Sequence, residues 1–193
     1  MKNARFTVLL AVLGAALAVP LQAVEYTRIE PERSRITFVY KQMNAPTEGS
    51  FKRFTSQLKL DPANPASGSA RFDVEVASID TGSAEGDDEV RGAQWFNAKA
   101  HPRAQFVSTT IKSAGPKLFD VTGKLTIKGK TQDVSTRATL REEGQQAVLE
   151  GSFVIKRTDF GIGEGVWTDP GTVAHDVQIR FRLLASAGGS VRQ

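Results

Sequence analysis

Apolar and polar residues alternate along most of the chain from Arg35 onward, which is the pattern of β-strands with one buried face. In the segment Ala70–Ala77, for example, Phe72 and Val74 fall on one face and Asp73 on the other. The same alternation predicts strands over residues 35–41, 50–60, 70–77, 104–112, 118–128, 131–141, 146–156 and 176–184.

Short turns are predicted between most of these strands. Lys128-Gly129-Lys130 has the composition of a tight hairpin turn. Asn44–Gly49 is predicted to be a turn built from Pro46 and Gly49. Eight strands with one apolar face each fit a sandwich or a closed up-and-down barrel. Strands of about 8 to 11 residues with few long interruptions favour the barrel, in which every edge is paired.

The long interruption runs from Ala77 to Thr109. It contains a short helical pattern over Ser83–Gly92, an acidic run over Asp87–Glu89, and the pair Trp95 and Phe96. The acids lack the spacing of a recognised calcium loop and are typical of the solvated first turns of a helix. We expect this stretch to be a crossover that covers one end of the barrel.

The first 23 residues have the pattern of a secretory signal peptide. Lys2 and Arg5 precede an apolar run over Phe6–Leu17, which at about 12 residues is too short to span a bilayer. Cleavage after Ala18 or after Ala23 fits the small residues there, and we prefer Ala23. The expected organisation is a signal peptide over 1–23, one barrel domain over 24–185 and a flexible tail over 186–193, with a periplasmic location.

Composition narrows the function further. The chain has 193 residues, 40% of them hydrophobic, and no Cys, so one domain has to rely on its core rather than on disulfides. Loss of Lys2 and Arg5 leaves 23 basic residues against 21 acidic ones, a net charge of +2 instead of +4. Without a Lys/Arg cluster, no nucleic-acid partner is expected.

Motifs for chemistry are weak. Thr126–Thr131 and Gly161–Gly165 resemble phosphate-binding loops, but no helix follows either one. His101 and His175 are the only histidines and lack metal-ligand spacing, so no metal site is expected. No nucleophile with a placed base is recognisable, and an enzyme is therefore not expected.

Three ordered segments resemble the signatures of the YceI-like family. They are Ser78–Phe106 with its Trp95-Phe96-Asn97, Val121–Thr131, and Lys156–Gly163. The resemblance covers nearly all of 24–185 and is closest to a sub-branch whose strand ends in Lys-Gln-Met, here Lys41–Met43. It implies an all-β, eight-stranded antiparallel, lipocalin-like barrel with short helical segments near its mouth.

The family resemblance also implies a periplasmic protein that holds a polyisoprenoid or similar amphiphile, such as a prenyl quinone, without chemistry and with no other cofactor. Arg91, Asp159 and His175 are the candidates for head-group contacts. The expected cavity and mouth residues are aromatic and aliphatic side chains of the predicted strands and loops: Phe38, Tyr40, Phe54, Phe72, Val74, Trp95, Phe96, Phe106, Phe153, Phe160, Trp167 and Phe181.

Other functions stay open at this level. The alternative is a redox accessory that works with a membrane-associated b-type cytochrome through a bound quinone or haem. An enzyme acting on such lipids is a further one. A barrel that is filled by its own Phe side chains and acts through its surface is the last alternative. Ligand identity, chain length and oligomeric state do not follow from the sequence.

Overall fold

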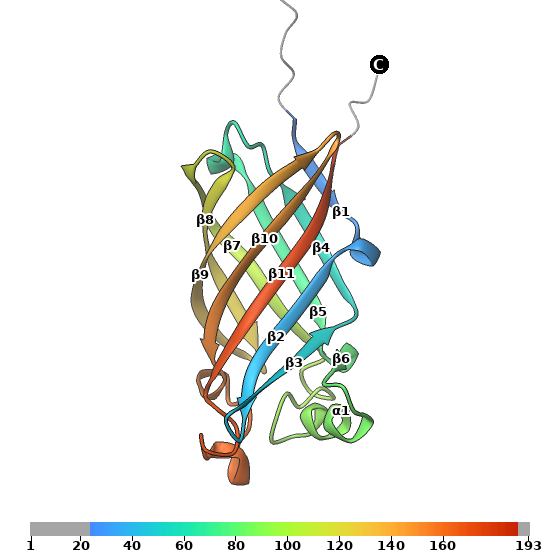
Figure 1. The fold of residues 1–193 in the computed structure, drawn as a ribbon, viewed down its shortest axis with the longest axis vertical. Helices are drawn as coiled ribbons and strands as arrows, with labels where there is room; N and C mark the ends of the chain where they lie inside the picture. Colours follow the sequence, from blue (N-terminus) through green and yellow to red (C-terminus); the bar gives the residue numbers. More distant parts are fainter. Residues whose placement is uncertain (1–23, 189–193) are drawn as a thin grey trace, which may run out of the picture.

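The structure is a computed structural model that describes residues 24–188, so the expected signal peptide lies outside the described residues. All its strands form one antiparallel sheet that curls around a central space (Figure 1). Along the main path of the sheet the strand order is β4-β5-β7-β8-β9-β10-β11-β2-β3-β6. The strands are β1 (Tyr26–Ile29), β2 (Arg35–Gln42), β3 (Ala45–Phe51), β4 (Phe54–Lys59), β5 (Ser69–Glu75), β6 (Ile79–Asp80), β7 (Arg103–Gly115), β8 (Leu118–Ile127), β9 (Lys130–Glu143), β10 (Gln146–Lys156) and β11 (Asp176–Ala187).

The short strand β1 closes the barrel at one end. It pairs with β11 on one side, and on the other side Tyr26 and Leu60 exchange two backbone hydrogen bonds of 2.8 and 2.9 Å. At this end the ring therefore runs β4, β5, β7, β8, β9, β10, β11, β1 and back to β4. The predicted antiparallel, lipocalin-like barrel is confirmed, although the sheet has more strands than the alternation predicted.

Most of the predicted turn over residues 44–49 is a strand, because β3 begins at Ala45. The chain reverses at Met43 and Asn44, which both have positive φ (47° and 65°), as in a two-residue hairpin turn. One edge of β3 pairs with β2, and the other edge pairs with β6 only at Ser50 and Phe51. Pro46 is therefore tolerated, because its missing N–H lies on the unpaired part of that second edge and breaks no ladder bond. The predicted strand over 50–60 is accordingly divided between the end of β3 and β4.

The predicted hairpin turn at Lys128-Gly129 is confirmed, since β8 ends at Ile127 and β9 begins at Lys130. The predicted helix is also present as α1 (Ala84–Arg91), where Ser83 Oγ caps the first turn by accepting a hydrogen bond from Gly86 N at 3.1 Å. β11 continues to Ala187, two residues into the stretch predicted as a tail.

Five short 3-10 helices complete the described elements: η1 (Pro31–Arg33), η2 (Pro65–Ser67), η3 (Val76–Ser78), η4 (Arg157–Phe160) and η5 (Gly165–Thr168). Helix α1 lies at the end of the barrel opposite β1, the same end as the β2–β3 and β10–β11 connections (Figure 1). None of the helices among residues 24–188 has the length and apolar character needed to cross a membrane.

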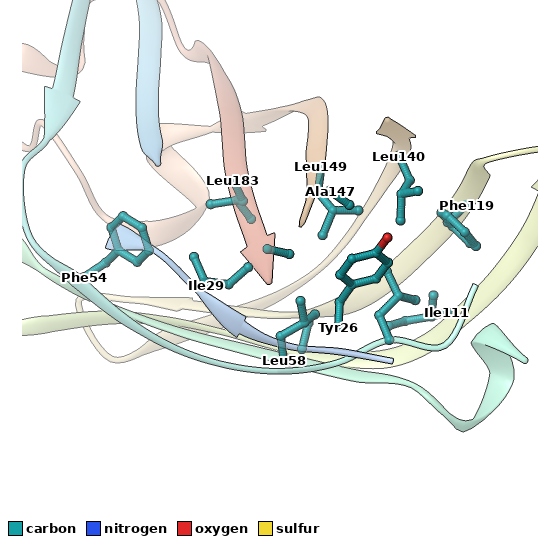
Figure 2. Close-up of a cluster of buried hydrophobic side chains, with 13 residues drawn as sticks. Tyr26, Ile29, Phe54, Leu58, Ile111, Phe119, Leu140, Ala147, Leu149 and Leu183 are labelled. Carbon is teal, nitrogen blue, oxygen red and sulfur yellow. The ribbon is translucent and has the colours of Figure 1, made fainter. Parts of the chain in front are cut away.

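The buried core is divided along the barrel axis. One cluster fills the β1 end, where Figure 2 shows the Tyr26 ring pointing across the barrel toward Ala147, Leu140 and Ile111. The second cluster surrounds Trp95, Phe160 and Ile162 near the α1 end. The β1 end is thus plugged by side chains, and an internal space can open only toward α1.

Candidate functional site

Two adjoining chambers occupy the barrel interior. The inner chamber has a volume of about 160 Å³ and apolar walls in which the only side chains with polar groups are Gln105 and Thr136. The mouth chamber, with about 560 Å³, lies toward α1. The two chambers share six wall residues, and they are therefore sections of one tunnel: Ile36, Val74, Ala104, Leu125, Phe153 and Ile179.

Phenyl rings lie flat against glycines in the tunnel wall. A Cβ placed on Gly49 would overlap the ring of Phe38, and one on Gly151 would overlap the ring of Phe181. In both pairs the Phe and the Gly face each other across neighbouring strands. Because the glycine leaves room for the ring at the wall, the ring does not fill the lumen, and an open space remains.

The mouth chamber is lined by aromatic residues from separate parts of the chain. Trp95, from the loop after α1, packs against Trp167 of η5 with ring centroids 5.4 Å apart. Phe96 meets Phe51 of β3 edge to face at 6.1 Å. Trp95 is only 8% exposed, and its Nε1–H has no acceptor among the described residues.

Arg157 is a buried cation in the wall of the mouth chamber, with 1% exposure. Its guanidinium donates hydrogen bonds to five backbone carbonyls at 2.6 to 3.1 Å and stacks 5.8 Å from the Trp95 ring centroid. Burial lowers the pKa of Arg157. The side chain thereby ties together the loop that carries Trp167: its acceptors are Ala174, Ile162, Gly163, Trp167 and Val173.

Polar side chains gather where the mouth chamber meets α1. Glu85 and Glu89 stand one helical turn apart, and Thr81 precedes the helix. Thr81 is bonded to Asp87 by its backbone N–H at 2.7 Å and its hydroxyl at 2.9 Å, which fixes the start of α1. These groups, together with Gln42, Thr47 and Ser83, form the rim of the tunnel.

Most of the residues that the sequence predicted for the cavity line one of the chambers. Phe54 and Phe160 do not, because both are packed into the core clusters. The others divide by chamber: Phe72, Phe106 and Phe181 line the inner one, Val74 and Phe153 line both, and Phe38, Tyr40, Trp95, Phe96 and Trp167 line the mouth chamber.

The three predicted head-group candidates lie outside the tunnel lining. Arg91 bonds to Asp88 at 3.2 Å and to the carbonyl of Ile79 at 3.2 Å. Asp159 is exposed on η4. His175 faces a groove on the outer surface over β2 and β10, with Nε2 3.1 Å from the carbonyl of Thr168.

Several tunnel residues were not predicted from the sequence. Glu89 belongs to the acidic run Asp87–Glu89, and Glu85 to the same predicted helix, which the sequence indicates only as a solvated helix face. Their position over the opening is a tertiary property. Arg157 lies in the third family-like segment, Lys156–Gly163, but no pattern in the sequence indicated that its side chain would be buried in the tunnel wall. Within residues 24–188, no group of three or more His, Cys, Asp and Glu side chains is placed to hold a metal ion.

Fold and site together define a class: a single-sheet β-barrel, plugged at one end, with an apolar tunnel that opens beside a short helix. The YceI-like domain model matches residues 27–185, and the chain belongs to this family.

Related sequences agree with this assignment. A UPF0312 protein of Azotobacter vinelandii is 36% identical over 120 residues, which is 59% of this chain and 62% of that protein. The match thus spans about three fifths of that relative's length. Protein YceI of Salmonella arizonae is 34% identical over 137 residues, covering 68% of this chain and 69% of the relative.

Solved structures show the same fold. The crystal structure of Burkholderia cenocepacia BcnA is 45% identical, with a TM-score of 0.80 over 82% of this chain and 100% of that one. A domain from Saccharophagus degradans, described as a polyisoprenoid binding domain, is 16% identical, with a TM-score of 0.67 over 86% of this chain and 99% of that one. At that identity the second likeness concerns the fold alone.

Proposed function

We propose that this protein binds the apolar chain of an amphiphilic lipid, of which a polyisoprenoid is the model, inside the barrel. The observation that carries the proposal is the tunnel itself, which is apolar, plugged by Tyr26 and its neighbours at one end and open toward α1 at the other. Its mouth chamber alone falls within the usual size of ligand pockets, about 300–1,000 Å³. The Saccharophagus degradans domain, which shares the fold, is described as polyisoprenoid binding, and this is the ligand class proposed here.

The tunnel also gives the ligand a direction. The polar side chains of the inner chamber are already engaged: Gln105 Nε2 donates to Asp73 at 2.7 Å and Thr136 Oγ1 donates to the carbonyl of Ser152 at 2.9 Å. A head group buried there would lose its water without gaining equivalent partners. The chain therefore enters first, each buried CH₂ contributing about 0.8 kcal/mol, and the head group stays at the rim.

The protein acts in this proposal as a carrier without chemistry, exported to the periplasm by its first 23 residues. A basic start followed by a short apolar run supports export. Fractionation of cells and mass spectrometry of the purified protein test this part, with a mature chain beginning at Val24 as the expected result. A chain that keeps Lys2 and stays in the cytoplasm would overturn it.

Ligand binding can be tested directly, because both tryptophans of the chain line the mouth chamber. We expect solvent extraction of the purified protein to release a lipid detectable by mass spectrometry. Titration of the delipidated protein with geranylgeraniol should change the tryptophan fluorescence with micromolar or tighter affinity. A protein that yields no lipid and shows no saturable fluorescence change with this prenol is not a carrier of this kind.

A further inference from the structure

We propose that the tunnel mouth selects its ligand by charge and accepts neutral head groups, such as a hydroxyl or a carbonyl, in preference to phosphate, diphosphate or carboxylate. This inference rests on the proposed function, because it concerns the same tunnel. It assigns the selecting role to Glu85 and Glu89 of α1.

The two carboxylates are placed at the mouth without partners of their own. Both line the mouth chamber, both are exposed, and neither forms an ion pair with another residue among 24–188. Two like charges four residues apart destabilise a helix slightly, so this arrangement does not serve the stability of α1. The neighbouring acids differ, since Asp87 and Asp88 are both bridged by Arg91.

The described part of the rim offers an anion no available cation. Arg157, the one basic residue in the lining of the described tunnel, has its guanidinium occupied by five carbonyls. Lys52, near the mouth, is bound to Asp80 at 2.7 Å. Arg91 lies outside the lining and is held by the acids of α1. An anionic head group would therefore meet two negative charges without compensation.

Neutral head groups find hydrogen-bonding partners at the same place. The amide of Gln42, the hydroxyl of Thr47 and the carboxylates themselves line the opening, and a carboxylate accepts a hydrogen bond from a hydroxyl. Moving an anion deeper to avoid the rim would take it into the apolar inner chamber, where an isolated charge is strongly disfavoured. The carboxylates at the rim and the apolar inner chamber thus both disfavour an anionic head group.

The sharpest test compares two ligands with one tail. Geranylgeraniol and geranylgeranyl phosphate differ only in the head group, and their dissociation constants can be measured by tryptophan fluorescence. We expect the wild-type protein at low salt to bind the prenol about tenfold more tightly, because two exposed charges each contribute a factor of about two to five. Near physiological salt the ratio should fall, since exposed charges are screened.

Substitutions identify the origin of the ratio. In the double variant Glu85→Gln/Glu89→Gln the ratio should fall about fivefold through tighter binding of the phosphate, and in Glu85→Lys/Glu89→Lys the phosphate should become the better ligand. The control is Glu32→Gln/Glu143→Gln, which also removes two carboxylates but at the other end of the barrel. Among residues 24–188 Glu32 has no ion pair, and Glu143 is paired with Arg141 at 2.9 Å. This control should keep the wild-type ratio.

The outcomes separate the two proposals. Equal affinity for both lipids in the wild type, or a ratio that neither salt nor the glutamine variant changes, overturns charge selection and leaves the lipid-binding proposal intact. Binding of neither lipid contradicts the proposed function itself. Circular dichroism of the variants shows whether α1 is retained, and Gln is a good helix former at both positions.

Discussion

At the residue scale, the open tunnel depends on positions that lack a side chain. Gly151 lies under the ring of Phe181, and a Cβ there would also come within 2.9 Å of the carbonyl of Arg137. We expect Gly151→Ala to lower the free energy of unfolding by about 1 to 3 kcal/mol, because the ring has to move out of its place against the wall. The displaced ring should also narrow the inner chamber and weaken the binding of long prenols.

The coupling between Gly151 and Phe181 can be measured by a double-mutant cycle, with the free energy of unfolding of each variant determined in urea. In a Phe181→Leu background the alanine should cost clearly less, since the smaller side chain vacates the space over Gly151. Equal costs in both backgrounds would show that the ring is not the group that requires glycine.

We expect substitution of Arg157, a buried charged residue of the tunnel wall, to lower the stability of the protein strongly. Arg157→Met removes five hydrogen bonds and leaves buried carbonyls without donors, and we expect a loss of about 3 to 5 kcal/mol in the free energy of unfolding. The control Arg137→Met, which breaks an exposed pair with Asp120, should have a much smaller effect, because exposed ion pairs contribute little to stability. Similar losses for the two variants would contradict the structural role given to Arg157.

Asp73 gives a pH-dependent prediction. The hydrogen bond from Arg71, and less strongly that from Gln105, lowers the pKa of the Asp73 carboxyl below its ordinary 3.8. A lowered pKa in the folded state stabilises the protein above the unfolded pKa, and this contribution disappears as the pH falls through the folded pKa. Asp73→Asn should therefore cost about 1 kcal/mol at pH 7 and progressively less below about pH 4.

Denaturant unfolding at several pH values checks the Asp73 prediction. Asp133→Asn, at an exposed pair with Lys124, serves as the control and should show a smaller effect at pH 7. A cost for Asp73→Asn that stays constant down to pH 2 would mean that the carboxylate charge does not contribute.

At the element scale, long alternating strands were the most predictable part of the fold. β5, β8, β9 and β10 were expected within a few residues of their bounds, because each buries one face over at least seven residues. β1, β3 and β6 were missed for local reasons. β1 and β6 are four and two residues long, too short for alternation to show, and β3 carries Pro46 and Gly49, which predict a turn wherever no partner strand is known.

The turn of the β2–β3 hairpin contains backbone strain at Met43 that a substitution can relieve. Met43 has a φ of 47° and a side chain that is 73% exposed, so it occupies a left-handed conformation without burying its side chain in return. We expect Met43→Asn to raise the free energy of unfolding by about 0.5 to 1 kcal/mol, because Asn tolerates this conformation better. Met43→Val, a β-branched residue, should lower it, and an opposite order in thermal unfolding would contradict the turn geometry.

At the scale of the whole molecule, the sequence predicted the kind of cavity better than its polar rim. Aromatic and aliphatic residues on the inner faces of strands could be assigned from alternation, and most of them line the tunnel. The rim depends on how α1 is docked over the opening, which no local pattern determines. The head-group candidate Asp159, for example, does not line the mouth chamber.

The plugged inner chamber should limit the length of the chain that the barrel accepts. Val121 lines this chamber, and Val121→Phe would place a larger side chain in space that the wild-type protein leaves empty. We expect stability to stay within about 1 kcal/mol of wild type, since the added volume meets a cavity and not a packed core. Affinity for geranylgeraniol should fall about tenfold, equivalent to about two CH₂ groups no longer buried, while the shorter prenol geraniol is little affected.

Val154→Phe, on the outer face of β10 at a position that is 60% exposed, is the matched control and should change neither affinity. Equal losses for the long and the short prenol would place the tail elsewhere than in the inner chamber, because only a chain that reaches its plugged end can sense this substitution.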